Sequence, residues 1–155
     1  MSFWKFLLVL LIILLAGLLQ NTDFLTVAGV KPNLLLAVLI AASFFIEEAA
    51  IYILLVLISA ILLKFNAGLE PESVAFALVA LAGGLIGKRL SWLPIFNNLA
   101  LVGAGTIIFY VLTAPAYFVS NFTGFGIELI YNLALSIILF KSLEVCLKTS
   151  SMLKT

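Results

Sequence analysis

The sequence predicts an all-α integral membrane protein, a bundle of six transmembrane helices, and three observations lead to this prediction. Of the 155 residues, 65% are hydrophobic and only 10% are charged, which leaves too little polar surface to cover a soluble globule. The charged residues divide the chain into uncharged windows of 15 to 17 residues, namely 6–22, 32–46, 49–63 and 73–87. A bilayer core of about 30 Å needs roughly 20 helical residues, so each window must extend into its charged flanks, whose long side chains reach the headgroups.

The first predicted helix covers residues 3–20. Lys5 followed by an apolar run has the outline of a secretory signal peptide. However, the residues at 18–20, Leu-Leu-Gln, lack the small side chains at alternate positions that a cleavage site requires. We therefore expect this segment to remain as the first transmembrane helix, with Trp4 in the headgroup layer.

The second and third helices are predicted over 31–46 and 47–65, with a very tight hairpin between them. Pro32 suits the first turn of a helix, where the missing N–H costs nothing. Glu47 and Glu48 suit the start of the third helix, where carboxylates complement the positive end of the helix dipole.

The fourth helix is predicted over 71–88, after a turn at 65–68 that contains a glycine. Gly83 and Gly87 are four residues apart and share one helix face, a spacing that lets two helix backbones approach closely in lipid. They are candidates for a partner-binding seam. Packing against other helices of the same chain is the alternative, and it is the one that we favour because such pairs are common in apolar helices.

The 38 uncharged residues between Arg89 and Glu128 exceed one membrane span. We expect an interfacial start at 91–94, a fifth helix over 92–118 that is kinked by Pro115, and a turn at 120–124. A sixth helix then follows over 124–147. The whole chain, 1–155, forms a single transmembrane domain in this interpretation.

An even number of spans places both chain ends on the same side of the membrane. With the N-terminus in the cytoplasm, six basic residues lie at cytoplasmic helix ends and two at the outer ends, which satisfies the positive-inside rule. The six are Lys5, Lys88, Arg89, Lys141, Lys148 and Lys154, and the two are Lys31 and Lys64.

Composition excludes several function classes. A net charge of +1 and the absence of a basic, aromatic-rich stretch exclude nucleic acid as a partner. The chain has no histidine and a single cysteine, Cys146, so neither a histidine-containing metal site nor an internal disulfide is possible. No nucleophile with a positioned base and no acid–base pair stands out, so we expect a protein that is not an enzyme and needs no cofactor.

Three polar residues within the predicted spans are candidates for an intramembrane polar site. Glu128 lies either inside the hydrocarbon, where an acid is a functional candidate, or in the first turn of the sixth helix at the interface. We favour the interfacial position. Asn97 and Asn132 are expected to form hydrogen bonds between helices, and lining a polar cavity is the alternative.

The residues Val-Lys-Pro-Asn-Leu-Leu-Leu at 30–36 resemble the start of the second helix in the rod shape-determining protein MreD family. Chain length, the number of spans and the basic pair after the fourth helix are also similar. The third helix departs from the family pattern, because 61–64 reads Ile-Leu-Leu-Lys and lacks the family's glycine and aspartate. The resemblance makes Lys31, Pro32 and Asn33 candidates for motif or partner-binding residues.

The resemblance implies a non-enzymatic scaffold subunit of the bacterial cell-elongation machinery in the cytoplasmic membrane. Such a subunit would bind an MreC-like membrane protein and support peptidoglycan synthesis and cell shape. Its fold would resemble the six-helix substrate-binding subunits of energy-coupling-factor vitamin transporters. The alternative function is therefore the substrate-binding subunit of a small-solute transporter.

The two functions predict different interiors. A scaffold predicts a dry, tightly packed bundle with apolar grooves that face lipid. A transporter subunit predicts a cavity near the outer surface lined by polar groups such as Asn97, Asn132 or Glu128. A closed cavity large enough for a vitamin, with Glu128 pointing into it, would favour the transporter.

Overall fold

The computed structural model describes residues 3–27, 29–63, 70–91 and 93–152, with side chains as far as residue 147. Within these ranges every regular element is α-helical except for one isolated antiparallel bridge between Val27 and Val30. The all-α prediction is confirmed for this part of the chain. The described helices are α1 (Phe3–Gln20), α2 (Leu34–Ser43), α3 (Ala49–Leu62), α4 (Pro71–Gly87), α5 (Pro94–Thr113), α6 (Pro115–Ser120) and α7 (Phe122–Met152).

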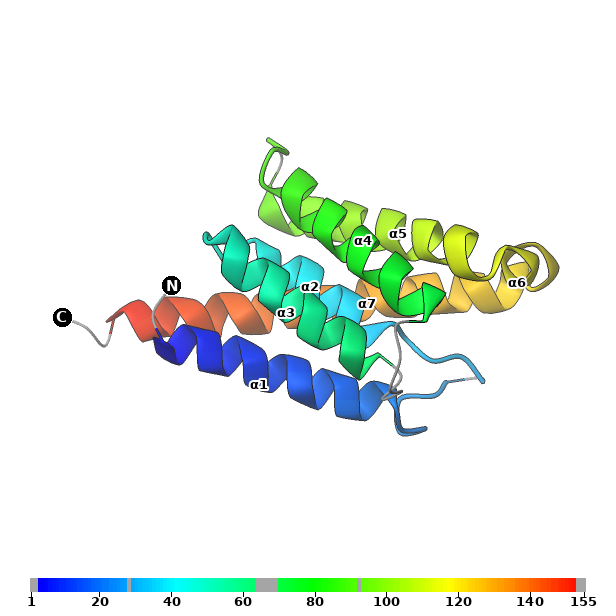
Figure 1. Ribbon diagram of the computed structural model, residues 1–155, viewed down its shortest axis with the longest axis horizontal. Coiled ribbons are helices and arrows are strands. Elements are labelled where there is room, and N and C mark those ends of the chain that lie inside the picture. The colour runs from blue at the N-terminus through cyan, green and yellow to red at the C-terminus, as the bar shows by residue number, and fades with distance from the viewer. Residues whose placement is uncertain (1–2, 28, 64–69, 92, 153–155) are drawn as a thin grey trace.

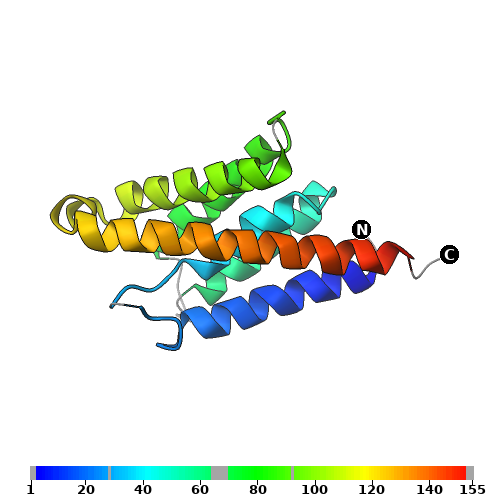
Figure 2. The same ribbon diagram turned by 180° about the vertical axis from the view of Figure 1, so that it is seen from behind.

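The helices form an elongated bundle in which successive long elements run in opposite directions (Figure 1). The first residues of α1 and the last turns of α7 lie at the same end of the bundle. Seen from behind, α7 extends along the whole length of the molecule (Figure 2). We refer to the end that holds α6 and residues 21–27 and 29–33 as the α6 end. The other end, which holds the turn at 44–48 and residues 88–91, is the opposite end.

Three described helices are long and apolar enough to cross a membrane, namely α1, α5 and the Phe122–Leu147 part of α7. The other apolar helices are shorter, with 10 residues in α2, 14 in α3 and 17 in α4. The prediction of 31–46 for the second helix is too long at both ends. At 1.5 Å per residue, α2 is only about 15 Å long.

Helix α2 is the centre of the bundle. All ten of its residues are buried, and it packs against α1, α4, α5 and α7. Its sequence, LLLAVLIAAS, is compatible with this position, because it contains no charged side chain whose burial would be costly. It ends where Ser43 Oγ donates to the Ile40 carbonyl at 2.7 Å, and the chain then turns at Phe44 and Phe45.

Helices α3 and α4 begin close to the predicted positions. Helix α3 follows Glu48, whose side chain makes no capping hydrogen bond, and α4 has Pro71 in its first turn. The predicted end of the third helix at 65 and the turn at 65–68 lie outside the described residues.

The two glycines proposed as a helix-packing seam lie inside the bundle. Both Gly83 and Gly87 are buried. A Cβ atom at Gly83 would lie 3.4 Å from Ile40 Cγ1, and one at Gly87 would lie 2.9 Å from Leu101 Cδ1. Their small size therefore allows α4 to approach α2 and α5, which is the intramolecular packing favoured from the sequence.

Proline breaks the predicted fifth helix instead of kinking it. Helix α5 ends at Thr113, and α6 begins at Pro115 after Ala114, which adopts φ −144° and ψ 58°. A residue before proline is disfavoured in the helical region, so the break falls at Ala114. The sixth predicted helix is also longer than expected, since α7 begins at Phe122 and ends at Met152.

Candidate functional site

Polar side chains pair across the interface between α5 and α7. Asn132 Nδ2 donates to Thr106 Oγ1 at 3.2 Å, and the Tyr110 hydroxyl donates to Glu128 Oε2. The two helices are antiparallel, and each carries its two polar residues four positions apart, on one face. Matching spacings on facing helices therefore bring the two pairs into register.

The buried start of α2 is held by side chains from three elements. Asn132 Oδ1 accepts from the Asn33 backbone N–H at 2.7 Å, and Gln20 Oε1 accepts from the Leu35 N–H at 2.9 Å. Asn33 caps the helix, because its Oδ1 accepts from the Leu36 N–H at 3.2 Å. Backbone amides in the first turn of a helix have no intrahelical partner, so these bonds allow the turn to be buried.

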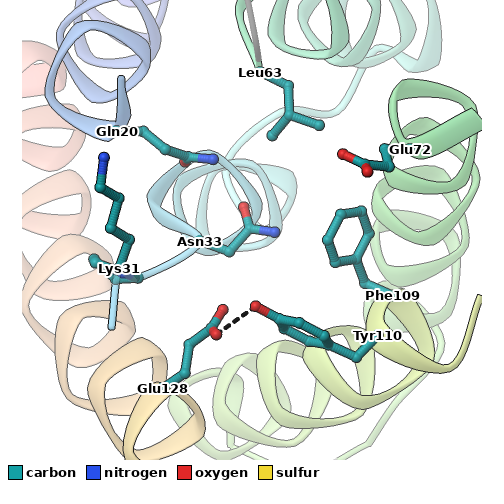
Figure 3. A pocket seen from close by; sticks show the side chains of 9 residues that line it. Gln20, Lys31, Asn33, Leu63, Glu72, Phe109, Tyr110 and Glu128 are labelled. Carbon is teal, nitrogen blue, oxygen red and sulfur yellow. Dashed lines mark hydrogen bonds between the residues drawn. The ribbon is translucent and has the colours of Figure 1, made fainter. Parts of the chain in front are cut away.

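A recess with a volume of about 360 Å³ lies at the α6 end. Its walls come from six segments of the chain, and its polar groups converge on the space between them (Figure 3). The lining residues are Gln20, Lys31, Pro32, Asn33, Leu63, Glu72, Phe109, Tyr110 and Glu128.

Glu128 is buried, with 4% of its surface exposed. The favoured placement of Glu128 in the first turn of the sixth helix is therefore wrong, and its burial makes it a candidate functional acid. Helix α7 begins at Phe122, so Glu128 lies in its second turn and not its first. In the wall of the recess, its side chain points toward the Tyr110 hydroxyl (Figure 3).

The other sequence-predicted residues separate into two groups. Lys31, Pro32 and Asn33 line the recess together with Glu128. Asn132 lies beneath this group in the interhelical network, as expected of an interhelical hydrogen-bonding residue.

Asn97 does not join the recess at the α6 end. It lines a different recess at the opposite end, where its Nδ2 donates to the Leu90 carbonyl at 3.2 Å. The three candidate residues of the intramembrane polar site are therefore not brought together. Only Glu128 lines the recess, and Asn132 supports the residues around it.

Sequence reasoning missed Gln20, Thr106 and Tyr110. The sequence did contain a signal for Thr106 and Tyr110. These two polar residues are four positions apart in one apolar helix, and Glu128 and Asn132 have the same spacing in the next long helix. Gln20 had no such signal. Its bond to the start of α2 depends on the fold of the chain between α1 and α2, which the sequence does not indicate.

Lys31 is paired at the mouth of the recess. Its Nζ lies 2.7 Å from Asp23 Oδ1, across a segment that reverses direction with Gly29 at φ +77°. The hydrogen bond and the positive charge of Lys31 hold the pKa of Asp23 below its ordinary value of 3.8. Both side chains are substantially exposed, so this pair contributes little to stability.

We expect Asp23→Asn to change stability only slightly, and in a pH-dependent manner. Because the folded-state pKa of Asp23 is lowered, the ion pair contributes above pH 3.8 and its contribution is lost as the pH falls through the lowered value. Melting temperatures in detergent should therefore differ slightly between wild type and variant at pH 7 and converge in acid. A difference that grows on acidification would contradict this assignment.

The recess can bind a ligand through hydrogen bonds, charge and aromatic contact. Among the described residues, no group of three or more His, Cys, Asp or Glu side chains could hold a metal ion. Comparisons with protein-family models, with curated proteins and with solved structures found no match to this chain. The likeness to the MreD family is therefore carried only by the residues described above.

Proposed function

We propose that this chain is a non-enzymatic scaffold subunit of the MreD type in a bacterial cell-elongation complex. The observation that carries the proposal is an apolar groove of about 260 Å³ between α4 and α5. All of its lining residues are apolar, and they are Leu78, Val79, Ala82, Gly83, Ile86, Leu101, Ala104, Gly105, Ile108 and Leu112. The resemblance at 30–36 to the start of the second MreD helix supports the same function.

The shape of the groove suits a transmembrane helix from another protein. Large side chains form its rims, including Leu78 at 60% exposed and Leu112 at 58% exposed. Small exposed residues, Ala82 and Ala104, lie between them. Small residues let helix backbones approach closely in lipid, where packing rather than the hydrophobic effect drives association. An MreC-like protein with one span is the proposed occupant.

In this proposal the chain crosses the bacterial cytoplasmic membrane six times, through α1 to α5 and α7. Helix α2 is short for a span, but it is enclosed by other helices, so its non-helical flanks need not face lipid. Lys5, Lys88, Arg89 and Lys141 belong to the opposite end, and Lys31 belongs to the α6 end. This distribution supports a cytoplasmic opposite end, with both chain termini in the cytoplasm.

Co-purification from detergent tests the scaffold function. We expect wild-type protein to retain a single-span MreC-like protein, and Ala104→Trp to lose it because the indole fills the groove. Ala134→Trp is the matched control, since Ala134 is exposed on α7 and does not line the groove. Wild-type protein that retains no single-span protein, or equal recovery with Ala104→Trp, would overturn the proposal.

A second candidate function is the ligand-binding subunit of a small-solute transporter. The recess at the α6 end favours it, because polar groups including Glu128 converge on a space of about 360 Å³. The recess opens at the end of the bundle and is not a closed cavity. Recovery of an ATP-binding module with the purified protein would support this function, and recovery of a single-span protein alone would contradict it.

A further inference from the structure

The recess at the α6 end has room for a small organic molecule. Its volume of about 360 Å³ lies within the usual range for ligand pockets, roughly 300–1,000 Å³, and far above the roughly 30 Å³ that one water molecule occupies. A bare ion would leave most of this space unfilled. The chemistry of the walls therefore decides which class of organic molecule fits.

Among the described side chains, the most buried charged group of the recess is an acid that forms no ion pair with a basic residue. Glu128 is 4% exposed and accepts a hydrogen bond from the neutral Tyr110 hydroxyl. No lysine or arginine among the described side chains forms an ion pair with it. A buried carboxylate is costly unless a positive charge and hydrogen bonds compensate it, so a cation bound in the recess would offset the cost of the charged form of Glu128.

The surrounding groups add to this preference. Glu72 brings a second carboxylate to the opposite wall (Figure 3). Lys31, the basic residue of the lining, has Asp23 at 2.7 Å to offset its charge. Phe109 and Tyr110 supply aromatic rings, whose faces attract ammonium groups.

We propose that this recess binds a small organic ammonium ion. Its charged nitrogen lies against Glu128, and its apolar part lies against Phe109 and Leu63. The proposal concerns the recess that supports the second candidate function, and it assigns a ligand class to that recess. It does not require that a transporter module be present.

Titration of the full chain in neutral maltoside micelles tests the ligand class. The probes are phenethylammonium, its neutral analogue 2-phenylethanol, and sodium chloride alone, with binding measured by calorimetry. We expect wild-type protein to bind phenethylammonium at least about tenfold more tightly than 2-phenylethanol, since charge pairs at desolvated sites contribute at least this much. Equal binding of the neutral analogue, or displacement by sodium at matched ionic strength, would overturn the proposal.

Two substitutions locate the site. Glu128→Gln removes the charge but keeps an oxygen that accepts from Tyr110, and it should weaken phenethylammonium binding by about tenfold or more. The matched control is Glu47→Gln in the recess at the opposite end, which should bind like wild type. If Glu128→Gln does not fold, Phe109→Leu should still weaken binding severalfold. Wild-type affinity in a folded Glu128→Gln or Phe109→Leu protein would overturn the proposal.

The outcomes also separate this proposal from the functions above. Phenethylammonium binding without any ATP-binding module would support the ligand class and count against the transporter. An ATP-binding module recovered with protein that binds no ammonium probe would support the transporter and overturn the ligand class. A third outcome is that wild-type protein binds no probe and Glu128→Gln loses a single-span partner. This result would overturn the small-ligand proposal, because the recess would then bind a basic side chain of that partner.

Discussion

Gly84→Arg should prevent the bundle from folding. Gly84 is buried in α4, and a Cβ atom there would lie 2.3 Å from Tyr52 Cε1. The Tyr52 ring cannot move away easily, because its hydroxyl donates to the Ala80 carbonyl at 2.7 Å and the ring is buried. The charge of the guanidinium would also be buried among apolar side chains, which adds to this steric cost.

A smaller substitution isolates the steric part of the effect. Gly84→Ala should lower the free energy of unfolding by about 1–3 kcal/mol, the usual cost of overpacking. Gly126→Ala is the matched control, since a Cβ atom there meets nothing within 4 Å. Thermal unfolding in detergent measures both. Wild-type stability in Gly84→Ala or Gly84→Arg would contradict the close contact between Gly84 of α4 and Tyr52 of α3.

Asn132→Leu should have the next largest effect on stability. Leucine cannot accept the hydrogen bond that Asn132 Oδ1 receives from the buried Asn33 N–H at 2.7 Å. An unsatisfied buried donor costs about 1–3 kcal/mol, and here it also disturbs the start of the central helix. We expect a lower melting temperature in detergent and earlier elution on size exclusion, because a partly unfolded bundle is larger.

Thr106→Val is the comparison for Asn132→Leu. Valine has nearly the same shape as threonine, and the substitution removes the hydroxyl that accepts from Asn132 Nδ2 at 3.2 Å and donates to the Val102 carbonyl at 2.8 Å. The bond to the Asn33 N–H is retained, so the loss of stability should be clearly smaller. Equal losses in the two variants would contradict the assignment of the Asn33 bond as the dominant interaction.

Local sequence signals predicted the outer helices well. Helix α1 has the predicted bounds, and α4 begins at the predicted proline, because a charged or proline-marked boundary flanks each of these apolar runs. The residues 31–33 were also singled out by the resemblance, and they do line the recess. These features depend on composition and on neighbours in the chain.

The missed features depend on contacts between distant segments. The buried start of α2 depends on Gln20 and Asn132, whose side chains accept hydrogen bonds from backbone amides there. The burial of Glu128 follows from its pairing with Tyr110, which requires the register of α5 against α7. Periodicity within one segment carries no information about that register.

Site-directed labelling tests the central claim, a bundle that crosses the membrane with its two ends on opposite sides. In a Cys146→Ser background, cysteines at Thr22 and Arg89 mark the α6 end and the opposite end, and both positions are exposed. With a membrane-impermeant maleimide, Thr22→Cys should react in intact spheroplasts, and Arg89→Cys should react only after permeabilisation. Labelling of both positions from the outside, or of neither before permeabilisation, would contradict this account.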